Sequence, residues 1–231
     1  MKRTWLVSMG IVLLALVGGG QVISAATRKK MAPKPAAMRP GKKAPAPVAI
    51  GRVLFDFEND LEGWRIPEWA TVKKDNALTE VASSGEQASH GARSLRMSTE
   101  FDASMWSGAY VEIERQSGEF MNFNGHDAIQ VSVYLPFSAP KKLKGEIILT
   151  VGEDWSWTEM RQPVELKAGA WTTVTADISD KSVAWKIPMN DAVRGDVRKL
   201  GVRVSANYLG YHGPVYIDDL RLTGTSARNG R

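Results

Sequence analysis

The sequence of 231 residues contains no cysteine and only three histidines. The absence of cysteine excludes a disulfide framework, a thiolate metal site, a cysteine nucleophile and a lipid anchor attached through cysteine. The sequence also lacks a Gly-x-Ser-x-Gly elbow, a His-Glu-x-x-His motif, a phosphate-binding loop and a dinucleotide fingerprint. Because the common signatures of catalysis are missing, we expect a protein that is not an enzyme.

Acidic residues are missing from the first 50 positions, which contain nine Lys/Arg and no Asp or Glu. Residues 51–231 carry 21 Lys/Arg and 25 Asp/Glu, so the basic excess belongs to the leader. The pI of 9.4 for the whole chain is therefore no indication of nucleic-acid binding, and we expect no nucleic-acid partner.

Residues 1–26 have the order of an export signal. Lys2 and Arg3 precede an apolar run from Trp5 to Val17, and small residues end the segment at Ala26. The apolar run is too short for a comfortable membrane span, which favours a signal peptide cleaved after Ala26. An uncleaved membrane anchor is the alternative. Either way the sequence predicts an exported protein that is periplasmic, extracellular or attached to the cell surface.

Residues 27–50 form a linker rich in proline, alanine and lysine. Proline favours an extended chain without internal hydrogen bonds, and like charges keep such a segment stretched. The segment is therefore predicted to be a solvated tether. The alternative is a basic arm that holds the protein to an anionic cell surface.

From residue 51 onward the pattern of apolar residues has a period of two, and no long amphipathic helix appears. Turn signals such as Asn124-Gly125 and Ala168-Gly169 separate the alternating runs. The predicted strands cover residues 53–57, 94–98, 109–114, 129–135, 147–151, 174–178, 200–204 and 215–222. Many short strands with one apolar face each predict an all-β fold over residues 51–223, with two antiparallel sheets packed face to face and a flexible tail at 224–231.

Several short motifs of this region resemble those of a known family. They are Phe55–Glu58, Leu61–Trp64, Gly91–Leu95, Val131–Pro136, Gly169–Val174 and Gly213–Leu222. Their order and spacing resemble the carbohydrate-binding modules with a galactose-binding-like jelly-roll fold. Such modules are non-catalytic domains usually attached to bacterial glycoside hydrolases, and some bind mannans or β-glucans. The resemblance covers nearly all of residues 52–223 and implies an exported polysaccharide-binding protein, expected as a monomer, that serves a glycoside hydrolase or a cell-surface component.

The resemblance also implies a structural calcium ion. In such modules a carboxylate near the first strand and one on the last strand share the ion. The matching residues are Glu58 and Asp218, with Asp56 as a third candidate. Calcium takes six to eight oxygen ligands in flexible geometry, and an ion would relieve the repulsion between neighbouring carboxylates. The alternative is that Asp56 and Glu58 simply face solvent.

Tryptophan is the strongest signal for sugar recognition, since an aromatic face packs against the C–H face of a pyranose. Trp155 and Trp157 lie among acidic residues, and in an extended segment both indoles would point to one side. Trp106 lies in a loop of small polar residues. These three are predicted to contact ligand, whereas Trp64 and Trp171 are predicted to be structural.

The polar faces of two central strands supply the remaining predicted ligand contacts. Gln130 and Tyr134 lie on the polar side of one strand, and Arg203 lies on the polar side of a later strand. In the resembling modules this face is often a concave sugar groove, although the same pattern also fits an ordinary solvated sheet face. Two other functions stay open: a structural or adhesive surface protein that makes protein contacts, and a small polysaccharide lyase or hydrolase using a Tyr/Arg pair.

Overall fold

The computed structural model describes residues 51–224. The predicted export signal, the predicted linker and residues 225–231 of the predicted tail lie outside the described residues. Within the described range, no helix is long and apolar enough to cross a membrane.

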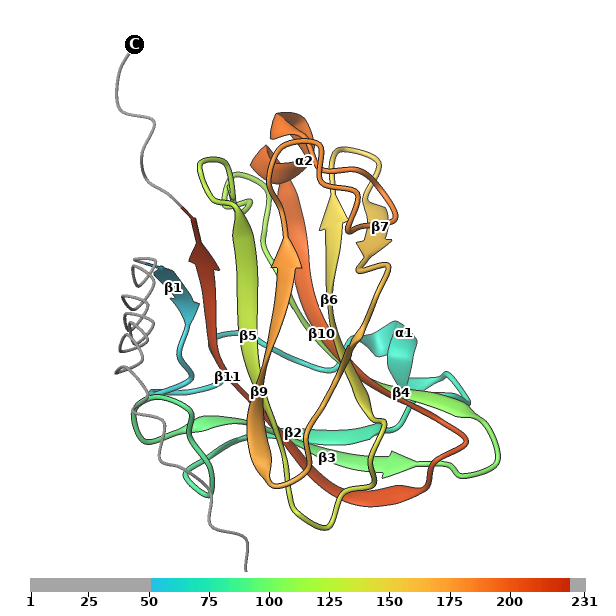
Figure 1. Ribbon diagram of the computed structural model, residues 1–231. Coiled ribbons are helices and arrows are strands. Elements are labelled where there is room, and N and C mark those ends of the chain that lie inside the picture. The colour runs from blue at the N-terminus through green and yellow to red at the C-terminus, as the bar shows by residue number, and fades with distance from the viewer. Residues whose placement is uncertain (1–50, 225–231) are drawn as a thin grey trace, which may run out of the picture. The chain divides into compact units, whose positions relative to one another are not determined.

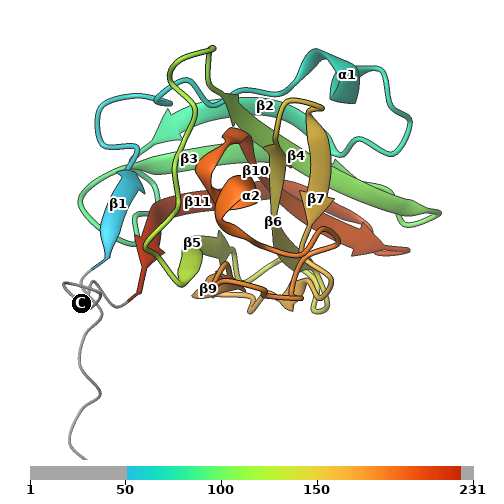
Figure 2. The ribbon, with the colours of Figure 1, turned by 90° about the horizontal axis from the view of Figure 1, so that it is seen from above.

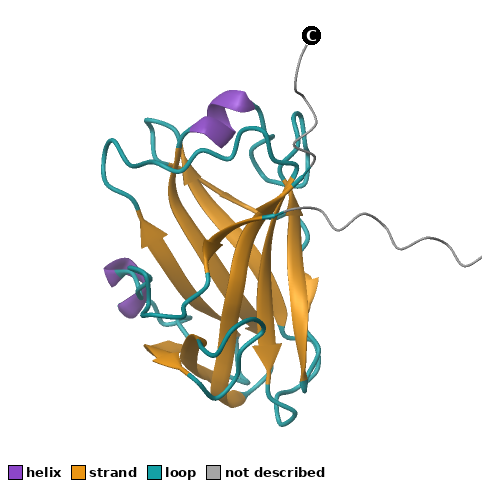
Figure 3. Ribbon diagram, turned by 90° about the vertical axis from the view of Figure 1, so that its left-hand side faces the viewer, coloured by secondary structure: helices purple, strands orange, loops and turns teal. Residues whose placement is uncertain are grey.

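The regular secondary structure of the described domain is almost entirely strand, and the two short helices lie outside the sheets (Figure 3). The strands are β1 (Arg52–Phe55), β2 (Leu78–Ser84), β3 (Ser94–Phe101), β4 (Trp106–Glu114), β5 (Ala128–Leu135), β6 (Lys144–Val151), β7 (Ser156–Glu159), β8 (Val164–Glu165), β9 (Ala170–Asp177), β10 (Val197–Asn207) and β11 (Tyr211–Thr223). The helices are α1 (Glu68–Thr71) and α2 (Asp191–Gly195). Each of the eight runs predicted from alternation contains a strand.

The strands form two antiparallel sheets that pack face to face (Figure 1). The six-stranded sheet has the order β2-β3-β11-β5-β9, and β1 pairs with β11. The five-stranded sheet has the order β4-β10-β6-β7, and β8 pairs with β6. The predicted two-sheet sandwich is therefore confirmed.

Alternation of side chains explains how the core forms between the sheets. Val131 and Val133 of β5 and Val202 and Val204 of β10 are fully buried, and their polar neighbours point outward. Trp64 plugs the core as predicted: its ring meets the ring of Phe55 edge-on, 5.5 Å between centroids.

A bulge in β11 changes whether the odd-numbered or the even-numbered side chains of the strand face the core. The pairing of β11 with β5 shifts register between Asp218 and Arg221, and Asp219 has a φ of 50°. An extra residue of this kind reverses the side-chain alternation beyond it. Ile217 and Leu220 are consequently both buried.

The two ends of the described domain lie side by side. Arg52, at the start of β1, pairs with Leu222, near the end of β11. Figures 1 and 2 both show β1 next to β11. Both ends therefore belong to the six-stranded sheet.

Candidate functional site

A groove follows β10 across the outer face of the five-stranded sheet. Its central hollow, of about 470 Å³, is lined by ten residues, four of which are aromatic. We name this central hollow the aromatic groove and define it by Trp69, Trp106, Tyr110, Trp157 and Arg203. A second hollow of about 360 Å³ shares Trp106 and Arg203 with it. A third, of about 460 Å³, shares Trp69.

The groove is long because its floor is one extended strand. The outward positions of β10 run from Lys199 in the third hollow, through Arg203, to Asn207 in the second. At the rise of a β-strand this distance is roughly 26 Å. The groove is therefore long enough for a linear ligand to lie along it.

Three aromatic rings meet at the centre of the groove. The ring centroids of Trp69 and Tyr110 are 5.4 Å apart, and those of Trp69 and Trp157 are 5.8 Å apart. Tyr110 and Trp157 are also 5.4 Å apart. Trp69 and Trp157 are 43% and 38% exposed, which is unusual for tryptophan and leaves large apolar surfaces open to solvent. Mutual packing fixes these rings before any ligand arrives.

Two glycines let the side chains lie flat on the sheet. A Cβ atom at Gly201 would lie 2.3 Å from the hydroxyl oxygen of Tyr110, so only glycine allows the tyrosine ring to cross β10. A Cβ atom at Gly108 would lie 3.1 Å from the ring of Trp106 and 3.2 Å from Cδ of Arg203. A glycine inside a strand often marks such a close approach.

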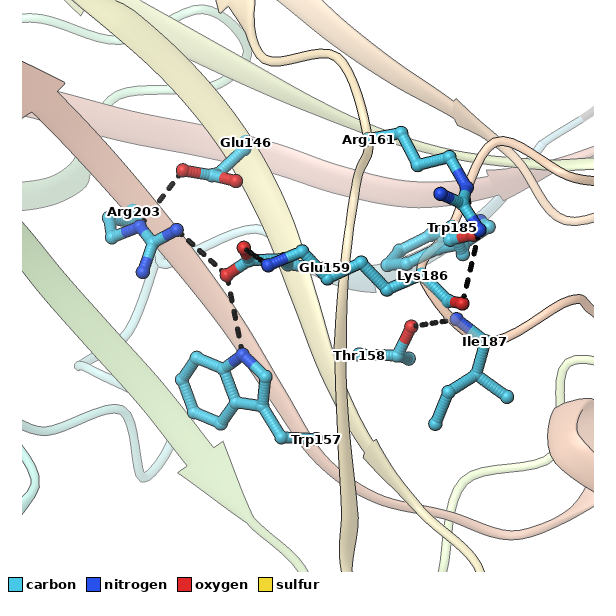
Figure 4. A network of polar contacts seen from close by, with 9 residues as sticks. All are labelled: Glu146, Trp157, Thr158, Glu159, Arg161, Trp185, Lys186, Ile187 and Arg203. Atoms are coloured by element: carbon cyan, nitrogen blue, oxygen red, sulfur yellow. Dashed lines mark hydrogen bonds and ion pairs between the residues drawn. The ribbon is translucent and has the colours of Figure 1, made fainter.

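Arg203 is the centre of an ionic network on the groove floor (Figure 4). Its Nε donates to Glu146 Oε1 at 2.9 Å and its Nη2 donates to Glu159 Oε2 at 2.8 Å. Glu159 also accepts a hydrogen bond from the Trp157 indole at 3.3 Å and is paired with Lys186. The network thus fixes a guanidinium group, whose Cζ lies 5.5 Å from the centroid of the Trp106 ring.

The two carboxylates of this network have opposite pKa shifts. Burial raises the pKa of Glu146, and the contact with Arg203 only partly opposes this effect. Burial also acts to raise the pKa of Glu159, but Lys186 and Arg203 outweigh it, and the pKa lies below its usual value.

A second ionic cluster lies toward the third hollow. Glu112 is almost fully buried and accepts hydrogen bonds from the Tyr110 hydroxyl at 2.9 Å and from Lys199 Nζ at 3.1 Å. Burial, with the charge of Glu112, raises the pKa of Tyr110 well above its usual value. Tyr110 therefore stays protonated and keeps its position on the groove floor.

The structure brings three of the six predicted ligand residues into the aromatic groove: Trp106, Trp157 and Arg203. Trp155 is separated from them because it lies in a turn with a φ of 53°, so the same-side geometry of an extended segment does not apply. Its ring packs against Phe120 and lies 5.8 Å from Nζ of Lys199. Trp155 therefore lies near Lys199 but does not line any of the three hollows.

Tyr134 and Gln130 lie on the opposite side of the sandwich from Arg203. Both belong to β5 of the six-stranded sheet, whereas Arg203 belongs to the five-stranded sheet. Tyr134 packs against Trp171, 5.4 Å between centroids, and Gln130 donates a hydrogen bond to Thr175. The alternation correctly predicts that these residues lie on an outer face of the sandwich. The prediction that they share this face with Arg203 is wrong, because β5 and β10 belong to different sheets.

Two of the three predicted calcium residues, Glu58 and Asp218, contact the same loop. Both Glu58 oxygens accept hydrogen bonds from the backbone N–H of Ala92, and Asp218 Oδ2 accepts from the N–H groups of Ser89 and His90. Asp218 Oδ1 accepts a hydrogen bond from the backbone N–H of Asp219, the next residue in the β11 bulge. Asp56 instead accepts from the N–H of Glu58, within its own segment.

One property of the Asp218 carboxylate at this loop suits the binding of a hard cation. Asp218 is fully buried, burial raises its pKa, and its partners within residues 51–224 are backbone N–H groups without a Lys or Arg. Carboxylate oxygens are ligands that Ca²⁺ takes, and Glu58 and Asp218 contact the same loop, where backbone N–H groups already occupy part of their accepting capacity. Among the described residues there is no cluster of three or more His, Asp or Glu side chains that could hold a metal, so backbone oxygens would have to complete the site.

Sequence reasoning did not identify Trp69 and Tyr110 as parts of the site. Tyr110 had a usable signal: it faces outward in the alternation of β4, two residues after a strand glycine. Trp69 had none, because its position depends on how the short helix α1 packs against β4 and β7.

Comparison with known proteins gives a family and a fold. The sequence profile of a family described as "Mannanase, galactose-binding domain-like" matches residues 55–219. No curated protein matches the sequence significantly.

Three solved structures with a similar fold come from carbohydrate-binding modules. One is CBM27-1 of Caldicellulosiruptor saccharolyticus in complex with mannohexaose: 16% identity, TM-score 0.55, covering 77% of this chain and 98% of that chain. Another is a CBM28 module specific for non-crystalline cellulose: 14% identity, TM-score 0.54, covering 73% and 92%. A third belongs to a study of promiscuous specificity in carbohydrate-binding modules of the β-sandwich superfamily: 17% identity, TM-score 0.52, covering 74% and 62%. The predicted galactose-binding-like sandwich is confirmed.

Proposed function

Because the chain belongs to the mannanase galactose-binding domain-like family, we propose that it is a non-catalytic polysaccharide-binding protein whose ligand lies along the aromatic groove. The observation that carries the proposal is the group of exposed rings over the strand β10. Trp69, Trp106 and Trp157 offer apolar faces for pyranose rings. Polar groups beside them, such as Asn76 and Asp75, can hydrogen-bond sugar hydroxyls.

The shape of the groove favours an internal segment of a linear polymer. The hollows are continuous through shared residues, Trp69 at one junction and Trp106 with Arg203 at the other. A chain of several sugars can therefore lie along β10 without an end being required. β-Mannan is the first polymer to test, given the family description and the mannohexaose bound by the CBM27 module.

Two carboxylates of the groove floor, Glu146 and Glu112, suit binding better than hydrolysis. A glycosidase needs one carboxyl group free to donate a proton and a second free to attack or to activate water. Glu146 and Glu112 are each held by a cation, Arg203 and Lys199 respectively. The groups serve in our proposal as supports for the groove floor.

Affinity electrophoresis of the whole protein tests this function. We expect retardation in gels that contain β-mannan, β-glucan or another neutral polysaccharide, and no increase in reducing ends when the same polymers are incubated with the protein. Migration unaffected by every polymer would contradict the proposal and favour the adhesive alternative. Release of reducing ends would favour the enzyme.

We also propose that Ca²⁺ binds where Glu58 and Asp218 meet the 89–93 loop. Because an ion that binds only the folded state stabilises it, calcium at about 100 times its dissociation constant should raise Tm by about 5–10 °C relative to chelator. Asp218→Asn should abolish the shift. Asp219→Asn should keep it, since Asp219 pairs with Arg221 instead. Thermal melts that coincide in calcium, magnesium and chelator would refute the site.

A further inference from the structure

The end of the groove beyond Trp106 differs in charge from the rest of the domain. Acidic residues outnumber basic ones in residues 51–231, 25 to 21. The second hollow reverses this balance, with two acidic side chains, Glu146 and Glu159, and five basic ones: Lys142, Lys144, Arg161, Lys186 and Arg203. We name the five the basic end.

The two carboxylates at this end are already neutralised within the protein. Arg203 bonds both of them, and Lys186 pairs with Glu159. Lys142, Lys144 and Arg161 form no ion pair with any residue in the range 51–224. Three basic side chains that belong to no ion pair consequently line one hollow, and the acidic residue opposite Lys144 in the strand pairing, Glu165, does not line it.

Arg161 is held in place by backbone groups rather than by an acid. Its Nε donates to the carbonyl oxygen of Trp185 at 2.8 Å, and its Nη2 donates to that of Lys186 at 3.3 Å. Figure 4 shows the guanidinium group against this segment. The charge is therefore positioned without being cancelled, which is the arrangement a site for an anion requires.

We propose that the basic end binds an anionic substituent of the polysaccharide, either a uronic acid carboxylate or a sulfate ester, while uncharged rings of the same chain occupy the aromatic groove. The inference rests on the proposed function, because the hollow shares Trp106 and Arg203 with that groove. Asn207 and Ser205 line the same hollow and can donate further hydrogen bonds to an anionic oxygen.

A nucleic acid fits this surface less well. Its charge repeats along the whole chain, whereas the hollow at the other end of the groove is lined by Glu68, Glu112 and Glu114 against only two basic residues. A polymer with charge on occasional substituents can place an anion at the basic end and neutral rings elsewhere.

The experiment compares matched polymers in affinity electrophoresis with the full chain. Glucuronoxylan is run against its carboxyl-reduced form, and a sulfated galactan against its desulfated form, at low and at high NaCl. We expect the charged member of at least one pair to bind about tenfold more tightly at low salt, and we expect salt to reduce the difference. The pair that responds identifies the anion as carboxylate or sulfate.

Variants locate the effect on the groove. Lys142→Gln with Lys144→Gln should remove most of the preference, measured as the ratio of the affinities for the charged and the neutral member of the same pair. The matched control is Lys181→Gln with Arg52→Gln. Lys181 shares the positive φ of Lys142 (63° and 75°), and Arg52 begins β1 as Lys144 begins β6. Neither control residue lines the groove hollows. The control should retain the preference.

Two outcomes would overturn the inference and leave the proposed function standing. One is equal binding of charged and neutral members at low salt. The other is a preference that falls equally in the Lys142→Gln/Lys144→Gln variant and in its control. Such a preference would reflect only the net charge of the protein. Absence of binding to every polymer would instead refute the proposed function itself. Competition by a single-stranded oligonucleotide as effective as the uronate polymer would also contradict the assignment.

Discussion

Replacing Trp157 with alanine should weaken polysaccharide binding by about thirtyfold or more while leaving the protein folded. Trp157 is 38% exposed and packs against both Trp69 and Tyr110, so its ring forms the centre of the aromatic groove. Loss of a central aromatic anchor commonly costs 2 kcal/mol or more, which is about thirtyfold in affinity. Titration calorimetry with the polymer that retards the protein most would measure the change.

Trp171→Ala is the matched control for this prediction. Trp171 is also a half-buried tryptophan on an outer sheet face, but it packs against Tyr134 on the six-stranded sheet. The Trp171→Ala variant should bind the polymer with the same affinity as the unaltered protein. A comparable loss in both variants, or a loss in neither, would remove the aromatic groove from the binding site. A cooperative melt for each variant shows that the comparison is between folded proteins.

Replacing Arg203 with methionine should lower the free energy of unfolding by about 3–5 kcal/mol at pH 7. The Glu146 side chain is 4% exposed, and Arg203 is its ion-pair partner. Removing one partner of a buried pair leaves the other charge uncompensated, which is strongly destabilising. The loss of Arg203 should destabilise the Glu159 carboxylate less, because Lys186 still pairs with it.

The loss in Arg203→Met should depend on pH in a defined direction. Burial already raises the pKa of Glu146, and without the opposing guanidinium the folded-state pKa must rise further. A carboxyl pKa that is higher in the folded than in the unfolded state destabilises the fold in full above the folded-state pKa, and this penalty decreases as the pH falls from the folded-state pKa toward the unfolded-state pKa. Part of the lost stability should therefore return between pH 7 and pH 5.

Denaturant unfolding at both pH values measures this effect. The double variant Arg203→Met with Glu146→Gln should be less destabilised at pH 7 than Arg203→Met alone, because no buried charge is left. It should also lose the recovery at pH 5. An equal loss at the two pH values, unchanged by Glu146→Gln, would show that Arg203 contributes through packing rather than charge.

The fold could be predicted because side-chain alternation depends on local geometry alone. In β5, and in β10 from Leu200 onward, every second residue is apolar, and this pattern identified both strands and their buried faces. β2 was missed because its sequence, LTEVASS, contains few strong apolar residues and pairs only along one edge, with β3. The bulge at Asp218 and Asp219 was not predicted. The sequence does reflect it, because the apolar residues change from odd to even positions between Ile217 and Leu220.

The site was predicted less completely because parity identifies an outer face but not the sheet to which the face belongs. Arg203 and Tyr134 both point outward, yet strand order places them on opposite sides of the sandwich. Strand order depends on long-range pairing, which one sequence does not reveal. The turn at Trp155 shows a related limit, since a single residue with positive φ was enough to separate its indole from that of Trp157.

The pairing of Arg52 with Leu222 has a consequence for how such a domain can be joined to other proteins. Chain entry and exit are neighbours on one sheet, and the groove occupies the outer face of the other. A domain with adjacent ends can be placed within or beside another polypeptide with little disturbance of either partner. Attachment to a bead or a surface through either end should likewise leave the groove accessible, so the same architecture suits a reagent for detecting polysaccharides.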